Sequence, residues 1–247
     1  MAEIQSLARG LVILERLATV PEGLGITQMA EEFKVDKGSM SRLLQTLAKY
    51  GYAEKDTKTR KYVLGPQILR LSRALLTRMP LREVAKPFLN QLVEETGECA
   101  HLAILAQGQA LYIDQVESSL VLRVATGVGT LAPLHCTALG KVLMAFGDTP
   151  LPEYLESFTM RTMTDPAMIQ RHLEQVRGQG YAMDDEEYYY GVRCIAVPVT
   201  DYRDKCVAAI GISGPSNRLT LETLPKMAMV VQGIGKALSN RLSFKTE

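Results

Sequence analysis

The segment from residue 26 to residue 65 constrains this chain most, because its residue pattern is typical of two short helices followed by a hairpin. Thr27 is the predicted N-cap of the first helix, and Lys34-Val-Asp36 is too short for anything but a sharp turn. The second helix ends at Gly51, and its buried face is predicted to hold Met40, Leu43, Leu44 and Leu47. This order predicts a helix-turn-helix, which places its second helix in the major groove of DNA.

The hairpin that follows is predicted to be a basic wing. Two short strands, residues 52–53 and 61–64, enclose a tip at residues 56–60. Residues 34–61 hold eight basic and three acidic side chains, whereas residues 1–33 carry a net charge of −3. Because the whole chain has a net charge of only +1, its positive charge is concentrated where a duplex would lie. A solvated basic face on a small helical domain is the alternative interpretation of the charge alone.

The predicted DNA contacts lie at the start of the first helix, on the polar face of the second helix, and in the wing. They are Thr27, Gln28, Lys37, Ser39, Met40, Arg42, Gln45, Lys58, Arg60 and Lys61. Within this set, Ser39, Met40, Arg42 and Gln45 are expected to contact base edges. The three wing residues are expected to bind phosphates, which positions the protein without reading sequence.

The length and the cysteines limit the remaining possibilities. A chain of 247 residues with 47% hydrophobic residues is long enough for two domains with proper cores. The four cysteines, at positions 99, 136, 194 and 206, show no metal-ligand or CxxC spacing, and no segment resembles a signal peptide. No apolar run is long enough to span a bilayer. We therefore expect free thiols, a cytoplasmic location, no membrane partner, and neither a cofactor nor a metal.

Helices flank the basic segment on both sides. A helix over residues 4–19 has an apolar stripe wide enough to pack on the helix-turn-helix and on a second copy of itself. Gly65-Pro66 ends the wing, and a leucine-lined helix over residues 67–78 is predicted to connect it to the rest of the chain. Met79-Pro80 ends this helix. The predicted domains are therefore 1–65 for DNA binding and 81–247 for a second domain, with a linker helix at 66–80.

The second domain shows a mixed α and β pattern. Thr137 and Asp165 are predicted helix N-caps, the latter followed by proline at the first helical position. Helices are predicted near residues 84–97, 137–146, 165–177 and 221–242, and strands near 101–106, 110–116, 121–125, 180–184, 194–200 and 206–213. This order predicts a sheet flanked by helices.

Motifs along nearly the whole chain resemble those of one known family. They are Arg42–Leu47, Gly51-Tyr52, Tyr62–Gly65, Pro133–Lys141, Gly180–Glu187, Gly191–Pro198 and Ile212–Pro215. On these motifs the chain resembles the isocitrate-lyase-regulator (IclR) type of bacterial transcription factors. Thr200-Asp201 departs from the pattern, which usually has an aromatic residue or His before the acidic residue. The fold class implied is two-domain α+β, with a winged helix-turn-helix joined by a linker helix to a GAF-like α/β effector-binding domain.

The resemblance also implies a pocket for a small metabolite, often a carboxylate or an aromatic acid. Carried over position by position, its effector-binding residues are Ala138, Leu139, Asp184, Cys194 and Ser213. Backbone N–H groups at the start of a helix suit an anionic group, Ser213 and Cys194 can donate hydrogen bonds, and Asp184 can accept one. Gly211 stands where some relatives carry a second hydroxyl. Apolar walls are expected from Val121, Val124, Leu131 and Leu134.

The implied function is a ligand-responsive regulator, a repressor rather than an activator, acting on a palindromic operator as a homodimer or a dimer of dimers. The family suggests dimers through the N-terminal domains and tetramers through the effector domains. Because one recognition helix contacts few base pairs, two-fold pairing is expected on physical grounds as well.

Several of these residues have alternative interpretations. Cys194 lies in an apolar strand, where a buried cysteine is often only a small hydrophobic residue. His135 beside Cys136 has the composition of a metal site or an activated thiol, but adjacent residues on an extended chain point apart. The run 184–187 is compatible with a solvated turn, and Tyr188–Tyr190 with either the mouth of the pocket or a subunit contact. An enzyme that uses Cys194 or His135 with Asp184 is the alternative function, although no nucleophile-elbow or phosphate-loop motif supports it.

Overall fold

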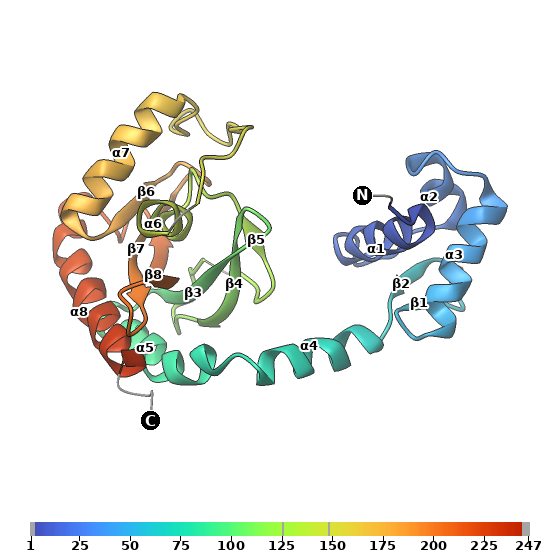
Figure 1. The fold of residues 1–247 in the computed structure, drawn as a ribbon, viewed down its shortest axis with the longest axis horizontal. Coiled ribbons are helices and arrows are strands. Elements are labelled where there is room, and N and C mark those ends of the chain that lie inside the picture. The colour runs from blue at the N-terminus through green and yellow to red at the C-terminus, as the bar shows by residue number, and fades with distance from the viewer. Residues whose placement is uncertain (1–2, 125, 148, 244–247) are drawn as a thin grey trace. The chain divides into compact units, whose positions relative to one another are not determined.

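The structure, a computed structural model, describes residues 3–124, 126–147 and 149–243 of the chain (Figure 1). The chain divides into two compact units, Met1–Met79 and Pro80–Glu247. The first is called the N-terminal unit and the second the C-terminal unit. Among the described residues, no helix combines the length and the apolar character that crossing a membrane requires.

The N-terminal unit is a helix-turn-helix with a wing and an additional helix at each end (Figure 1). Its elements are α1 (Gln5–Ala18), α2 (Ile26–Glu32), α3 (Lys37–Lys49), β1 (Ala53–Lys55), β2 (Tyr62–Leu64) and α4 (Gln67–Thr77). Their core is built from Ile13, Leu17, Leu24, Met29, Met40 and Leu44. Burial of each such side chain contributes about 1.5–3 kcal/mol, so this small core holds the three helices and the wing together.

The ends of the short helices differ from the sequence prediction at one position. Gly25 is the N-cap of α2, and Thr27 lies inside the first turn, so the prediction of a Thr27 cap is wrong. An aspartate starts the next helix, because Asp36 Oδ1 accepts a hydrogen bond of 2.8 Å from the backbone N–H of Ser39. Hydrogen bonds from the Ser39 side chain and from its backbone N–H lower the pKa of Asp36. The sharp turn before α3 therefore ends in a capping contact that fixes where the recognition helix begins.

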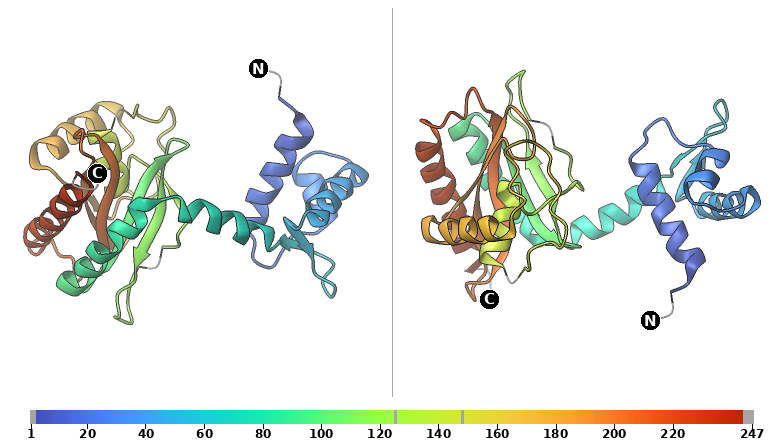
Figure 2. Two further views of the ribbon diagram at one scale, coloured as in Figure 1. Left: turned by 60° about the horizontal axis from the view of Figure 1, so that its bottom comes forward. Right: turned by 90° about the horizontal axis from the view of Figure 1, so that it is seen from above.

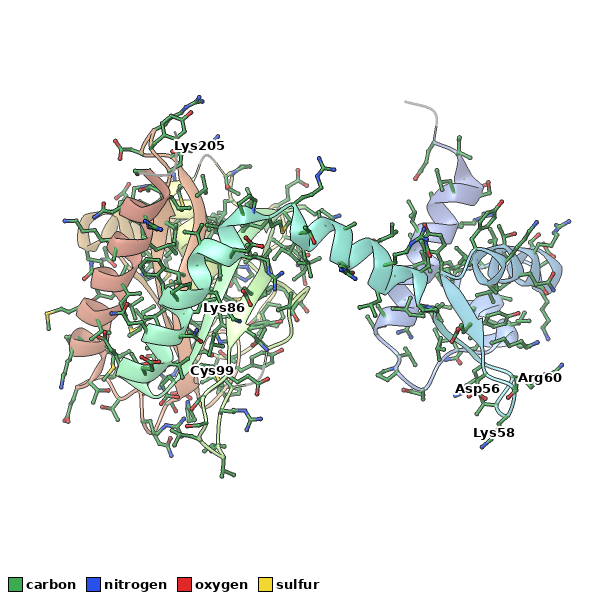
Figure 3. The ribbon with its side chains drawn as sticks, turned by 90° about the horizontal axis from the view of Figure 1, so that it is seen from below. Asp56, Lys58, Arg60, Lys86, Cys99 and Lys205 are labelled. Atoms are coloured by element: carbon green, nitrogen blue, oxygen red, sulfur yellow. The ribbon has the colours of Figure 1, made fainter. Side chains whose placement is uncertain are left out.

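A single carboxylate organises the tip of the wing. Asp56 Oδ1 accepts hydrogen bonds from the backbone N–H groups of Lys58, at 2.8 Å, and Thr59, at 2.6 Å. Arg60 adopts a left-handed backbone conformation with φ of 62°. In Figure 3, Asp56, Lys58 and Arg60 lie together at the end of the hairpin. The turn thus holds the basic residues of the wing at its outer end.

The C-terminal unit is a six-stranded antiparallel sheet covered by helices, with the strand order β5-β4-β3-β8-β7-β6. Its helices are α5 (Pro80–Thr96), α6 (Ala138–Phe146), α7 (Pro166–Gln179) and α8 (Leu224–Ser243). Its strands are β3 (Cys99–Ala106), β4 (Gln109–Val116), β5 (Leu131–Ala132), β6 (Ala182–Asp185), β7 (Val192–Thr200) and β8 (Cys206–Pro215). In the views of Figure 2, α5 lies beside α8 and α7 beside α6.

The two helix pairs cover opposite faces of the sheet. Alternate residues of a strand point to opposite faces. On β7, Ala196 belongs to the apolar cluster that includes α6 and α7, whereas Val197 is close to Gly235 of α8. The face toward α6 carries small residues such as Ala103, Ala196 and Ala209. These let α6 approach the sheet closely, which places the first turn of α6 over the central strands.

One predicted strand is absent and one observed strand was not predicted. Residues 121–124 lie outside any strand, and residue 125 lies outside the described residues. Val121 is 98% exposed, so its β-branched side chain has no neighbouring strand to pack on. The place beside β4 is taken instead by β5, through the pairs Ala110↔Ala132 and Leu111↔Leu131. The predicted helix caps Thr137 and Asp165 are confirmed.

Candidate functional site

The recognition helix α3 presents a polar face with two local side-chain contacts. Lys37, Arg42 and Gln45 are exposed and Ser39 is half-buried. Arg42 Nη2 donates a hydrogen bond of 3.1 Å to Ser39 Oγ, one turn earlier on the helix. Gln45 Nε2 donates to Ser41 Oγ, also at 3.1 Å. The guanidinium of Arg42 is thus held by one weak contact and keeps further donors free, as bidentate contact with guanine requires.

Met40 does not belong to this polar face. Its side chain is 0% exposed and lies in the core of the N-terminal unit with Leu44 and Ile13. A side chain buried in this way cannot reach a base, so the prediction that Met40 contacts DNA is wrong. The helical spacing that also assigned Met40 to the buried face was the correct indicator.

A basic residue of α1, which was not among the DNA contacts predicted from the sequence, lies close to the same helix face. Arg9 lines a shallow cleft between α1 and α3, together with Ser39, Arg42 and Thr46. The cleft therefore brings two guanidinium groups to one side of the N-terminal unit. The indicator in the sequence was the position of Arg9 beside the apolar stripe of a helix predicted to pack on the helix-turn-helix.

One cavity of the C-terminal unit, here called the C-terminal cavity, has a volume of about 290 Å³ and is lined from α6 and from the sheet. Ala138 and Leu139 come from the first turn of α6, and Asp184, Cys194 and Ser213 from β6, β7 and β8. The three strand residues are direct neighbours across the sheet, because Asp184 pairs with Cys194 and Cys194 pairs with Ser213. All five residues named from the sequence thus line one cavity.

The first turn of α6 brings backbone donors to this cavity. Thr137 Oγ1 accepts a hydrogen bond of 3.1 Å from the N–H of Gly140 and donates one of 2.6 Å to the carbonyl of Pro133. The first N–H groups of a helix have no partner within the helix and carry its positive dipole end. Because Ala138 and Leu139 occupy this turn and line the cavity, the site suits an anionic or strongly polar ligand group.

A histidine–serine pair forms a further polar part of the cavity. His101 Nε2 lies 2.6 Å from Ser213 Oγ, and the His101 ring packs edge-to-face against Tyr112 at 5.4 Å between centroids. Burial lowers the pKa of His101 to about 4, so the imidazole is neutral at pH 7. According to the tautomer, Nε2 either accepts the Ser213 hydroxyl proton or donates its own N–H to Oγ. The pair can therefore present either a donor or an acceptor to a ligand.

Asp184 is buried beside a short acidic turn. Its side chain is 2% exposed, and Oδ1 accepts a hydrogen bond of 2.7 Å from the N–H of Glu187. Burial raises the pKa of Asp184 to about 7, although Lys141 and the Glu187 N–H favour the ionised form. Burial and the nearby Asp184 also raise the pKa of the Cys194 thiol well above its usual range. The cavity therefore holds a neutral thiol and a carboxyl group that titrates near neutral pH.

A buried ion pair lies behind this turn. Lys141 on α6 is 0% exposed, and its ammonium donates to the carbonyl of Met183 at 2.9 Å and to Glu187 Oε1. The pair ties α6 to the turn that follows β6. Helix α6 supplies Ala138 and Leu139 to the cavity, and β6 supplies Asp184. In the sequence, Lys141 and Glu187 stand out only as parts of two motifs of the family resemblance. Their contact joins residues 46 positions apart, which a local pattern does not reveal.

Both units of the chain match domains of one known protein family. Residues 6–57 match the IclR helix-turn-helix domain, and residues 73–240 match the family described as bacterial transcriptional regulator IclR C-terminal. The chain belongs to the IclR family. It is accordingly a DNA-binding transcriptional regulator with a C-terminal effector domain.

Curated relatives cover nearly the full chain. The HTH-type transcriptional regulator BhcR of Paracoccus denitrificans is 37% identical over 96% of this chain and 86% of its own length. The HTH-type transcriptional regulator XynR of Escherichia coli is 33% identical over 99% of both chains. The glycerol operon regulatory protein of Streptomyces coelicolor is 35% identical over 97% of this chain and 96% of its own.

Solved structures of the IclR family share the two-domain α+β fold. The IclR of Thermotoga maritima has a TM-score of 0.74 at 27% identity, covering 98% of this chain and 100% of its own. A regulator from Alicyclobacillus acidocaldarius has a TM-score of 0.82 at 25% identity, and the match covers 97% of this chain and 99% of its own. An IclR homologue from Microbacterium hydrocarbonoxydans complexed with 4-hydroxybenzoate has a TM-score of 0.78 at 20% identity, covering 96% and 98%.

The apolar walls of the cavity are formed by other residues than most of those predicted from the sequence. Val124 lines the cavity as predicted. Val121 instead points to solvent, Leu131 is partly exposed at 38%, and Leu134 is buried in the cluster beneath α6. The walls are supplied by Tyr112, Tyr188, Tyr189, Val192, Ile195 and Ile212, among others. The sequence left open whether Tyr188 and Tyr189 lie at a pocket or at a subunit contact. Both line the cavity.

His135 is separate from the cavity. Its Nε2 lies 2.9 Å from the carbonyl of Glu156, its ring packs near Phe158, and it does not line the cavity with Cys194 and Asp184. Within the described part of the chain, no group of three metal-ligating side chains occurs, and all four cysteines are free. His135 is therefore not placed to act as a base on the Cys194 thiol.

Proposed function

We propose that this IclR-family regulator is a repressor whose C-terminal cavity binds a small carboxylate or aromatic acid and thereby changes operator affinity. One observation carries the proposal. The first turn of α6 and the side chains of Asp184, Cys194 and Ser213 converge on one cavity of about 290 Å³, in a chain that also has a helix-turn-helix. Apart from these groups, His101 and the hydroxyls of threonines and tyrosines, the lining is apolar, as small-molecule sites generally are.

Different residues of the N-terminal unit are proposed to contact the bases and the phosphates of DNA. Exposed donors on α3, above all Arg42 with Ser39 and Gln45, are proposed to contact base edges. The remaining proposed contacts are to phosphates, made by Thr27, Gln28 and Lys37 near the helix starts and by Lys58, Arg60 and Lys61 of the wing. Arg9 joins this group because it shares a cleft with Arg42. Phosphate contacts fix the register in which α3 enters the groove.

Exposed leucines support pairing of two copies over a palindromic operator. Leu7 and Leu11 on α1 are 60% and 55% exposed, and Ile4 extends the same helix face. On α4, Leu69, Leu71 and Leu75 are also exposed. Apolar faces of this kind on a protein that needs two half-sites favour a homodimer, and a dimer of dimers is proposed through the C-terminal units.

Repression is the proposed sense of regulation, and the cytoplasm the proposed location. The transcriptional repressor IclR of Escherichia coli is 30% identical over 93% of this chain and 87% of its own. A ligand that binds one DNA-binding arrangement better than another would shift operator occupancy without new DNA contacts. The enzyme alternative is disfavoured because His135 lies away from Cys194 and the thiol stays protonated.

Replacement of Ser213 by valine is expected to weaken ligand binding about 10- to 100-fold, because a hydrogen bond to a charged group contributes about 1.5–3 kcal/mol. The measurement is the melting temperature of the full chain titrated with lactate, benzoate and 4-hydroxybenzoate, since a ligand stabilises in proportion to its concentration over its dissociation constant. Ser157→Val, at an exposed serine outside the cavity, is the matched control and should titrate like the wild type. Equal shifts in Ser213→Val and wild type would place the ligand elsewhere.

A further inference from the structure

We propose that a carboxylate ligand occupies the C-terminal cavity only together with a proton on Asp184, so that ligand binding is coupled to proton uptake. The inference rests on the proposed function, which assigns a carboxylate to this cavity, and adds a specificity rule to it. The proton comes from solvent and binds a carboxylate oxygen of Asp184, and no other bond forms or breaks.

The first support is the charge of the groups around Asp184. Among the described residues that line the cavity, none is Lys or Arg. The titratable groups that face Asp184 are Lys141 of α6, Glu187 of the following turn, Cys194 of β7, Cys136 before α6, Tyr112 of β4 and the adjacent Tyr188. Of these, only Lys141 carries a positive charge.

The second support is that Lys141 is already neutralised. Its ammonium donates to Glu187 Oε1 and to the Met183 carbonyl, and its side chain has no exposed surface. The pair therefore contributes no net charge to the cavity. An ionised Asp184 leaves one buried negative charge, and a carboxylate ligand would add a second beside it. Two carboxylates that share a buried site cannot both stay ionised at low cost.

The third support is that Asp184 can take up the additional proton from solvent near neutral pH. Its side chain is buried, Oδ1 accepts a hydrogen bond from Glu187 N–H, and the Tyr188 N–H and the Cys194 thiol also hydrogen-bond to the carboxyl group. The neighbouring Asp185 is instead paired outside the cavity with Arg193 and Arg161. Burial raises the pKa of Asp184 to about 7. Once protonated, Asp184 offers an O–H donor that a ligand carboxylate can accept.

The other cavity groups do not change charge in the same range. His101, on β3, has a pKa lowered to about 4 by burial, and burial raises the pKa of Cys194, Tyr112 and Tyr188, and that of the nearby Cys136. Asp184 is thus the group of the cavity whose charge changes between about pH 6 and about pH 8. If only the protonated form binds, the apparent dissociation constant rises about tenfold over this interval.

The test is calorimetric titration of the full chain with lactate, benzoate and 4-hydroxybenzoate, and with the corresponding uncharged amides, at about pH 6 and about pH 8. Each carboxylate that binds is expected to bind about tenfold more weakly at the higher pH, and buffers of different ionisation enthalpy should report uptake of about one proton there. The amides should bind with the same affinity at both pH values. The wild-type measurement alone decides the point, whatever happens to a variant.

Asp184→Asn supplies the second arm of the test. It is expected to bind the same carboxylates with no pH dependence, because the amide replaces the protonated carboxyl. Glu174→Gln, which removes an exposed carboxylate of α7, should keep the wild-type pH profile. A wild-type chain that binds a carboxylate equally well at both pH values, without proton uptake, would overturn the inference while leaving the proposed function intact. Failure of every carboxylate to bind wild type and Asp184→Asn at either pH would overturn both.

Discussion

Replacement of Lys141 by methionine is expected to lower the free energy of unfolding of the C-terminal unit by about 3–5 kcal/mol, because it leaves Glu187 buried without its cation. Glu187 is 6% exposed, and its Oε2 has no hydrogen-bond partner within the described residues. The measurement is amide hydrogen exchange of β7 and β8 in the full chain, which reports the opening of this unit alone. The expected loss is a large share of a typical domain stability of about 5–15 kcal/mol.

Two further variants separate charge from packing in this prediction. Lys226→Met removes an exposed lysine of α8 and should change exchange little. The double variant Lys141→Met with Glu187→Leu should recover most of the loss, because replacing both members of a buried pair by apolar groups is often neutral. A single Lys141→Met variant as stable as wild type would show that the pair does not fasten α6 to the turn that follows β6.

Replacement of Arg42 by alanine is expected to weaken binding to the specific operator about 10- to 100-fold, since a bidentate base contact discriminates by about 1–3 kcal/mol. Binding to random DNA should weaken much less. Arg42 is exposed on α3 with one weak contact to Ser39, so its removal leaves the core of the N-terminal unit intact. The measurement is fluorescence anisotropy with operator and random duplexes at one fixed salt concentration, because affinities vary steeply with salt.

Lys49→Ala is the matched control for Arg42. Lys49 is also a basic, exposed residue of α3, but it lies in the last turn. Its removal should weaken binding to both duplexes by similar small factors, as loss of a phosphate contact does. Equal losses on the two duplexes for Arg42→Ala would show that Arg42 binds phosphate only.

Local pattern was enough to predict the N-terminal unit. Helical spacing, the short turn before α3 and the basic hairpin are features of neighbouring residues, and all three appear in the structure. The errors arose where one residue suited two roles. Met40 occupies both the apolar spacing of α3 and the side expected to face DNA, and burial decided between them. Similarly, Thr27 is a good N-cap residue, but Gly25 already starts α2.

The C-terminal unit was predictable in its elements but not in its contacts. The valines at 121 and 124 give the run 121–125 strand propensity, yet propensity does not supply a neighbouring strand. The five cavity residues came from family resemblance, and the structure places them together. His101 and Lys141 escaped notice because their partners, Ser213 and Glu187, lie 112 and 46 residues away in sequence. Such contacts depend on the register of the sheet and on how α6 packs, which no local pattern specifies.

A ligand in the C-terminal cavity is proposed to change operator affinity. The most direct test is the binding isotherm of the full chain on a duplex enriched from a random pool, with and without a saturating carboxylate that raises its melting temperature. Coupling free energies are typically about 1–3 kcal/mol, so the dissociation constant should change at least about fivefold. Ser213→Val, assayed at the same ligand concentration, should keep the unliganded affinity and lose the change. Superimposable isotherms with the ligand demonstrably bound would contradict the claim.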